Sequence, residues 1–153
     1  MATWVITGAN RGLGLEFAKQ LLAEGHTIIA GVRNPEAMDF HHEQMTVYQL
    51  DVASTTSVET FAKNVKSSVE SIDVLVNNAG RMDGRWQHLG EVDPDLSLDV
   101  LNVNTIGPLR VSQALWPLLQ GEKPTKVANI SSLMGSIDDC MSGRSYAYRT
   151  SKT

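Results

Sequence analysis

Short apolar runs alternate with longer amphipathic stretches along the chain. Five short runs are rich in apolar and β-branched residues, which predicts strands at residues 3–7, 27–32, 45–50, 73–76 and 126–131. Between them, apolar residues recur every three or four positions, which predicts helices over residues 13–24, 56–69, 96–119 and 146–153. Continuous apolar strands separated by helices are typical of a parallel sheet covered on both faces.

Right-handed crossovers between such strands give a doubly wound α/β fold of the Rossmann type. A complete double unit has six strands and five are predicted here, so we expect a sheet that is incomplete at its C-terminal edge. The strand at residues 126–131 would then be an exposed apolar edge. Residues 1–153 are expected to form a single Rossmann-type domain. Pro108 predicts a kink in the helix over 96–119, and Thr56 with Glu59 predicts a capping box.

Composition narrows the class of protein. The chain has 153 residues, of which 42% are hydrophobic, with a net charge of −4, so it is expected to be globular and to bind neither nucleic acid nor anionic membranes. Cys140 is the single cysteine, which excludes an internal disulfide framework.

No apolar run is long enough for a transmembrane helix and no secretory signal is present, so we expect a cytoplasmic protein. His41 and His42 lie in a polar loop without ligand spacing, and no metal site is predicted.

A glycine-rich loop follows the first strand. It reads Thr7-Gly8-Ala9-Asn10-Arg11-Gly12-Leu13-Gly14 and opens the first helix. Glycines there allow a tight turn, close approach of backbone N–H groups to a pyrophosphate, and close packing of helix on strand. A plain strand-to-helix turn would also use glycines, but the position at the start of a βαβ pattern favours dinucleotide binding.

The end of the second strand favours NADP(H) over NAD(H). An acidic residue there would bind the ribose 2′-hydroxyl of NAD, whereas this strand is followed by Arg33. A guanidinium suits a 2′-phosphate, and Arg11 in the glycine loop is a second candidate for the same phosphate. The alternative interpretation is a solvated arginine at a strand end.

Tyr148 and Lys152 are four residues apart on the last predicted helix. This spacing places a phenol beside an ammonium. An ammonium about 4 Å away stabilises a phenolate by about 4 kcal/mol in a protein, which would lower a tyrosine pKa from about 10 toward ~7. Such a tyrosine exchanges protons at neutral pH, as hydride transfer to a carbonyl requires. The pair alone is common by chance on a surface helix.

Several further motifs occur in a characteristic order. The chain resembles the single-domain branch of the short-chain dehydrogenase/reductase family, and more weakly its C-factor-like carbonyl reductases. The matching segments are Thr7–Gly14, Leu50–Val52, Asn77–Gly80, Asn102–Gly107, Ile130–Ser132 and Tyr148–Lys152.

The resemblance implies a catalytic role for four residues. Tyr148 would be the general acid in reduction and the base in oxidation, and Lys152 would lower its pKa and bind the nicotinamide ribose. Ser132 would orient the substrate carbonyl, with Ser131 the less favoured choice. Asn104 would hold a water of the proton relay and brace the long helix.

The resemblance also implies a cofactor site. Asp51 and Val52 would lie against the adenine, and Arg33 matches a position that is basic in members preferring NADP(H). The remaining residues implied in cofactor binding are Gly8, Asn10, Arg11, Gly12, Leu13, Gly14, Asn78, Ala79 and Gly80. The partner would be a small carbonyl or alcohol substrate.

Members of this family continue well past the helix that begins near Tyr146. We therefore expect that the chain is a fragment or a truncated gene product. In such a chain Tyr148 and Lys152 would be poorly positioned, because only a short part of their helix is present. Three hypotheses stay open: an NADP(H)-dependent oxidoreductase, a nucleotide-binding module with weak or no turnover, and an interaction fragment. Homo-oligomer formation would use the helix near 96–119.

Overall fold

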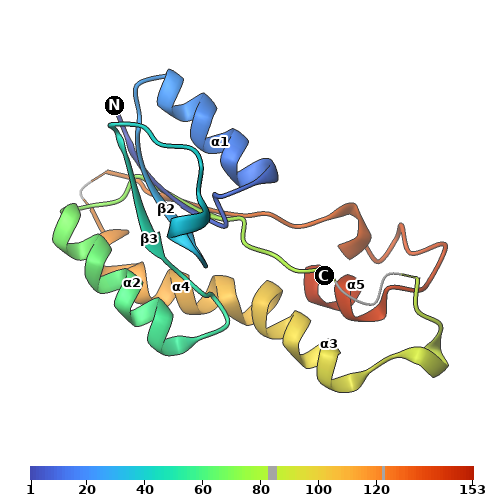
Figure 1. Ribbon diagram of the computed structural model, residues 1–153. Helices are drawn as coiled ribbons and strands as arrows, with labels where there is room; N and C mark the ends of the chain where they lie inside the picture. The colour runs from blue at the N-terminus through green and yellow to red at the C-terminus, as the bar shows by residue number, and fades with distance from the viewer. Residues whose placement is uncertain (83–85, 122) are drawn as a thin grey trace.

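The computed structural model describes residues 1–82, 86–121 and 123–153 (Figure 1). One sheet of five parallel strands lies at its centre, in the order β3-β2-β1-β4-β5. This confirms the doubly wound fold expected from the sequence. The strands are β1 (Thr3–Thr7), β2 (Thr27–Val32), β3 (Met45–Gln49), β4 (Val74–Asn77) and β5 (Lys126–Asn129).

The direction of winding reverses between β1 and β4. The chain first moves from β1 to β2 and β3 on one side, and then returns to place β4 and β5 on the other side. In open parallel sheets ligands bind in the crevice outside the carboxyl ends of the strands at this reversal. The ends of β1 and β4, at Thr7 and Asn77, therefore mark the expected site.

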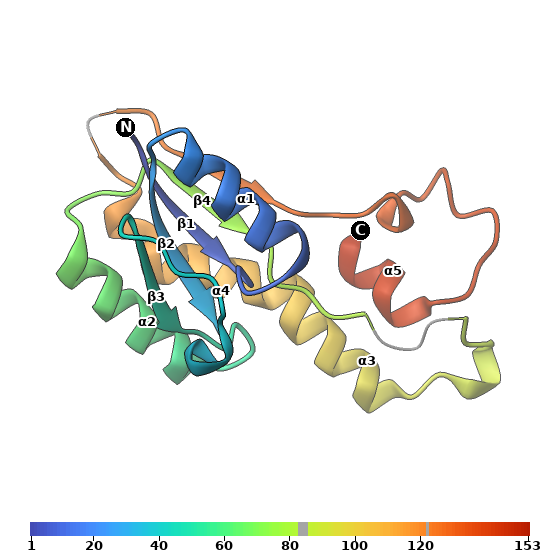
Figure 2. The same cartoon turned by 45° about the horizontal axis from the view of Figure 1, so that its top comes forward.

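Helices cover both faces of the sheet. Helix α1 (Gly12–Ala23) lies on one face, whereas α2 (Thr55–Ser68) and α4 (Gly107–Leu115) lie on the other (Figure 1). Helices α3 (Pro94–Leu101) and α5 (Tyr146–Lys152) pack together beyond the carboxyl ends of the strands (Figure 2). Short 3-10 turns occupy Pro35–Ala37, Leu89–Glu91, Trp116–Leu118 and Leu133–Gly135.

Strand periodicity divides the core into two clusters. Val5 is fully buried and belongs to the cluster with Phe61 of α2 and Leu115 of α4. Ile6, the next residue, is also fully buried but belongs to the cluster with Leu22 of α1. Alternate residues of one strand thus serve both layers, as expected for a strand buried on both faces.

Helix α2 begins one residue earlier than the sequence predicts, and the capping-box prediction was wrong. Ser54 is the N-cap, and its Oγ accepts the Ser57 N–H at 3.3 Å. Ser54 has extended backbone angles, whereas Thr56 and Glu59 already lie inside the helix. A hydroxyl immediately before the helix therefore supplies the cap that was assigned to Thr56.

The predicted long helix over 96–119 is interrupted. It begins as α3 at Pro94, passes through a π-helical segment at Asn102–Ile106 and continues as α4 to Leu115. Pro108 has no N–H to donate to the carbonyl of Asn104 four residues earlier, and the π-helical segment lies directly before it. The kink expected at Pro108 is thus realised as a widened turn.

Strand β5 is one edge strand of the sheet, and β3 is the other. It ends at Asn129, two residues earlier than predicted, and all four of its residues are exposed. Within the described residues it pairs only with β4. The exposed edge expected from the sequence is therefore present in this structure.

Candidate active site

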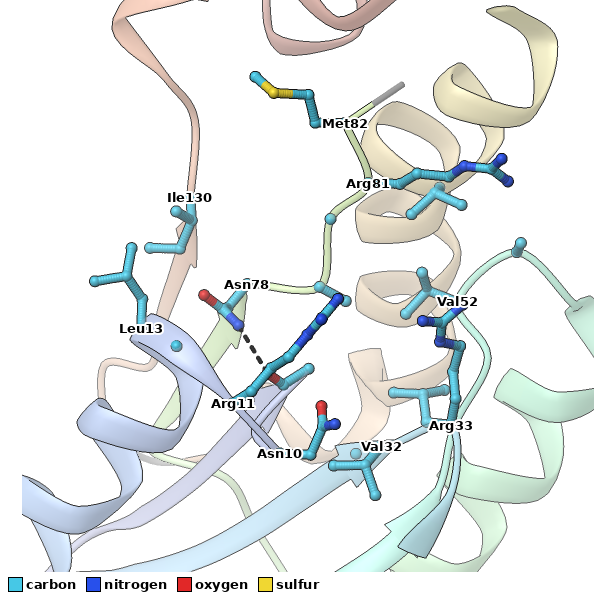
Figure 3. A pocket seen from close by; sticks show the side chains of 18 of the residues that line it. Asn10, Arg11, Leu13, Val32, Arg33, Val52, Asn78, Arg81, Met82 and Ile130 are labelled. Carbon is cyan, nitrogen blue, oxygen red and sulfur yellow. Dashed lines mark hydrogen bonds between the residues drawn. The ribbon is translucent and has the colours of Figure 1, made fainter. Parts of the chain in front are cut away.

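A cavity of about 940 Å³ lies over the carboxyl ends of the strands, between the glycine loop and helix α5 (Figure 3). Its volume lies in the upper part of the range common for ligand sites. Thirteen residues that the sequence assigns to catalysis or cofactor binding line this cavity: Gly8, Asn10, Arg11, Gly12, Leu13, Arg33, Asp51, Val52, Asn78, Ala79, Gly80, Tyr148 and Lys152. Gly14, Asn104 and Ser132 are not among the lining residues.

The glycine loop has the shape that phosphate binding requires. Gly8 has φ +70°, and a Cβ there would lie 2.9 Å from the Ala79 Cα. Gly14 is buried below the loop, where a Cβ would overlap the carbonyl oxygen of Gly8. These two glycines let α1 start close to the strand ends. The N-cap residue Arg11 makes no side-chain hydrogen bond to the first turn, so the N-terminal N–H groups of α1 suit an anion.

Asn78 joins the glycine loop to the loop after β4. Its Nδ2 donates to the carbonyls of Thr7 at 3.0 Å and Gly8 at 3.1 Å, and the latter bond is visible in Figure 3. In return, the Thr7 hydroxyl accepts the backbone N–H groups of Asn78 and Ala79, both at 3.0 Å. The two loops at the reversal point therefore form one rigid floor.

The charged residues of the cavity wall are predominantly basic. Arg11, Arg33, Arg81 and Lys152 line it, and Asp51 is the one carboxylate among the lining residues. The Arg11 and Arg33 side chains reach the cavity from neighbouring elements, the glycine loop and the end of β2 (Figure 3). Arg81 lies 3.9 Å from the Asp99 carboxylate of α3. Such a wall favours a polyanionic ligand.

Lys152 is held at the end of β5. Its Nζ donates to the Ile130 carbonyl at 2.7 Å, and Ser131 Oγ donates to the Lys152 carbonyl at 2.7 Å. Burial lowers the pKa of the Lys152 ammonium below its usual value. Tyr148, one turn earlier on α5, lines the same cavity. The phenol and the ammonium thus share the cavity with the glycine loop.

Asn104 lies in the π-helical segment and is 6% exposed. Its Oδ1 accepts the Arg81 N–H, and its Nδ2 donates to the Arg81 carbonyl, both at 2.8 Å. Nδ2 also donates to Ser151 Oγ at 2.8 Å. Asn104 therefore braces the cavity wall and α5 from behind, a contact that places it beside the site rather than in its lining.

The two serines after β5 differ in how their hydroxyls are used. Ser131 lines the cavity, and its hydrogen is donated to the Lys152 carbonyl. Ser132 is the N-cap of the turn at Leu133–Gly135, and its Oγ accepts the Met134 N–H at 3.2 Å. Ser132 therefore keeps a hydrogen that it can donate elsewhere.

Comparison with known proteins agrees with this arrangement. The family model for short chain dehydrogenases matches residues 2–153. The chain belongs to the short-chain dehydrogenase family. The NADPH-bound carbonyl reductase from chicken fatty liver superposes with a TM-score of 0.84 at 28% identity, over 99% of this chain and 69% of that protein. The resemblance inferred from the motifs is thus confirmed.

Two relatives of this chain are longer proteins. It is 27% identical to (+)-neomenthol dehydrogenase of Arabidopsis thaliana, over 90% of this chain and 55% of the relative. It is 34% identical to 1-hydroxy-2-glutathionyl-2-methyl-3-butene dehydrogenase of Rhodococcus sp. strain AD45, over 99% of this chain and 66% of the relative. The chain thus spans between half and two thirds of the length of these two proteins.

The cavity has lining residues that the sequence analysis did not assign to the site. Arg81 and Met82 follow the Asn77–Gly80 motif directly, and Ile130 precedes Ser131. The available signal was that Arg81 and Met82 follow a family motif directly and that Ile130 lies within one. Among the described residues, no cluster of His, Cys, Asp or Glu is suited to hold a metal ion, and no helix is long and apolar enough to cross a membrane.

Proposed function

We propose that this protein is an NADP(H)-dependent oxidoreductase that transfers hydride between the nicotinamide and a small carbonyl or alcohol substrate. One observation carries the proposal: a single cavity brings together the glycine loop at one end of the chain and Tyr148 with Lys152 at the other. A dinucleotide lying across the strand ends would place its phosphates on the loop and its nicotinamide near α5.

The residues present fit NADP(H). Asn10, Arg11, Gly12 and Leu13 would hold the pyrophosphate at the start of α1, below which Gly14 lets the helix pack. Arg33 and Arg11 supply guanidinium groups for a 2′-phosphate, and Asp51 lies beyond them on the β3 side. Asp51 and Val52 would contact the adenine. A carbonyl reductase with a similar fold has been solved with NADPH bound, which supports the same choice.

The chemistry divides between cofactor and protein. The bound nicotinamide supplies or accepts the hydride, while the protein orients the reactants and moves the proton. Tyr148 would donate a proton to the substrate oxygen during reduction and remove it during oxidation. Lys152 would favour the phenolate by its charge, and Ser132 would donate its unused hydrogen to the substrate oxygen.

Substitution of Tyr148→Phe tests the proposal. Loss of the phenolic proton should lower turnover of an aldehyde or diketone at least about a hundredfold, since general acid catalysis contributes roughly 10²–10⁴-fold. NADPH affinity, measured by titration of nicotinamide fluorescence, should be unchanged. The reaction is followed by absorbance at the nicotinamide band.

Tyr146→Phe is the matched control, because Tyr146 lies on the same helix and carries Thr150, not lysine, four residues later. It should retain turnover. Wild-type protein that binds no NADPH would refute the proposed function. Binding without turnover by the wild-type chain would instead identify a nucleotide-binding module, and undiminished turnover of Tyr148→Phe would refute the proton-transfer role.

A further inference from the structure

The turn after β3, residues 50–53, forms one wall of the cavity. We call it the β3 turn. The Leu50 N–H donates to the Val32 carbonyl at 2.8 Å, and the Asp51 N–H donates to Ser57 Oγ at 2.9 Å. These bonds tie the start of the turn to β2 and α2. They leave the carbonyls at its far end to be satisfied by another element.

Side chains from α4 and from the π-helical segment bind those carbonyls. Arg110 donates from Nη1 to the Val52 carbonyl at 2.6 Å and from Nη2 to Asn102 Oδ1 at 3.0 Å. Asn102 in turn donates from Nδ2 to the Ala53 carbonyl at 3.2 Å. One guanidinium and one amide thus hold two successive carbonyls of the β3 turn.

Gly107 allows this close approach. A Cβ at Gly107 would lie 3.0 Å from Val52 Cγ2 and 3.1 Å from Val52 Cβ. Glycine therefore lets the start of α4 lie against Val52, a residue that is 6% exposed. The packing of Gly107 and the hydrogen bond from Arg110 therefore fix the position of the same residue, Val52.

The π-helical segment brings Asn102 and Arg110 together. Eight residues of α-helix make about 2.2 turns, which would leave their side chains about 80° apart around the axis. A π-helical turn takes up one extra residue, so the same eight residues make close to two turns. The two side chains then lie on the same side of the helix, which explains a bond between residues eight positions apart.

The same segment also holds the opposite end of the cavity. Asn104, two residues after Asn102, binds both backbone groups of Arg81. The π-helical segment and α4 therefore join the β3 turn to the loop after β4. The spacing between these two walls is set by one helical element.

We propose that Arg110, acting with Asn102, is a positioning residue for the cofactor: it holds the β3 turn where Asp51 and Val52 can receive the adenine of NADP(H). This inference rests on the proposed function, because it takes the adenine as the group that contacts this turn. Arg110 itself acts through the Val52 carbonyl and is not a lining residue. If the β3 turn were displaced, the adenine half of the cofactor would bind more weakly, whereas binding of the nicotinamide half would not change.

The test measures binding of three ligands: NADPH, adenosine 2′,5′-bisphosphate and reduced nicotinamide mononucleotide. Arg110→Met keeps an unbranched side chain but removes both donors. It should raise the dissociation constants of NADPH and the bisphosphate about tenfold, the magnitude of one lost hydrogen bond to a charged group. The dissociation constant of the mononucleotide should not change. Lys63→Met is the control, since it removes the same charge from an exposed position on α2.

Asn102→Leu is a second variant that keeps the inference testable if Arg110→Met does not fold. It removes the bond to Ala53 and should shift the same two constants in the same direction. Equal weakening of both half-ligands, or unchanged NADPH binding in both variants, would overturn the positioning role. Wild-type protein that binds none of the three ligands would instead overturn the proposed function.

Discussion

At the scale of single residues, residue type and spacing identified the glycine loop, Arg33, Tyr148 and Lys152, and the family resemblance supplied most of the other predicted lining residues. Tyr148 and Lys152 were found because a phenol and an ammonium four residues apart have a chemical reason to be together. Arg110 carried no such signal: its importance depends on the Val52 carbonyl, 58 residues away in the chain. Contacts from a side chain to a distant backbone group leave no pattern in the sequence.

The choice of cofactor can be tested at Arg33. In Arg33→Asp, a carboxylate replaces the cation that would hold the 2′-phosphate, so NADPH affinity should fall about tenfold to a hundredfold. The affinity for NADH should stay the same or increase. Fluorescence titration gives the dissociation constants of both cofactors, and their ratio measures the preference for NADPH over NADH. Lys63→Asp controls for the change in net charge, and an unchanged ratio in Arg33→Asp would remove Arg33 from the phosphate site.

The buried ammonium of Lys152 predicts a dependence of stability on pH. Because burial lowers its pKa, the folded protein releases this proton at a lower pH than the unfolded chain does. Between the two pKa values the unfolded chain binds more protons, so the contribution of Lys152 to stability rises with pH. Below the folded-state pKa the full penalty is present, and above the ordinary value of 10.5 it is absent.

Lys152→Met removes this group. Urea denaturation of wild type and variant from pH 7 to pH 10 should show a difference in unfolding free energy that moves in favour of wild type as the pH rises. A difference that stays constant across that range would show that the Lys152 ammonium is not penalised by burial.

At the scale of elements, the sequence predicted which segments are strands and helices better than where they end. Apolar runs identified the five strands, and β1, β2 and β4 are largely buried, as expected for strands with apolar residues on both faces. The π-helical segment at Asn102–Ile106 was not predictable from period, since its apolar pattern continues that of α3. The π-helical segment lies directly before Pro108, which accounts for its position. Its role depends on two distant loops that it binds, the β3 turn through Asn102 and the loop after β4 through Asn104.

Gly14 tests how closely the first helix must approach the strands. In Gly14→Ala the added Cβ would overlap the Gly8 carbonyl oxygen, and backbone on both sides must move. Overpacking of this kind costs about 1–3 kcal/mol of unfolding free energy, and it should also abolish NADPH binding. Urea denaturation and fluorescence titration measure the two effects.

Gly90→Ala is the matched control, because a Cβ at Gly90 meets no atom within 4 Å. Its unfolding free energy should stay within about 0.5 kcal/mol of wild type, as for a surface substitution. If Gly14→Ala behaved like this control, α1 would not need its close approach to the glycine loop.

At the scale of the whole molecule, helices pack on both faces of the sheet but leave the edge strand β5 exposed. All four residues of β5 are exposed, and Val127 is 45% exposed although its partner Leu75 on β4 is fully buried. Unpaired strand edges pair readily with other chains. We therefore expect the 153-residue chain to associate as its concentration rises.

Val127→Lys should reduce this association, because a charge on an edge strand opposes pairing. Light scattering across a concentration series measures the effect, with Lys63→Met as a control that should associate like wild type. Equal association of Val127→Lys and wild type would show that β5 does not mediate it. The exposed apolar residues Leu109 of α4 and Trp116, directly after α4, would then be the candidate contact surface.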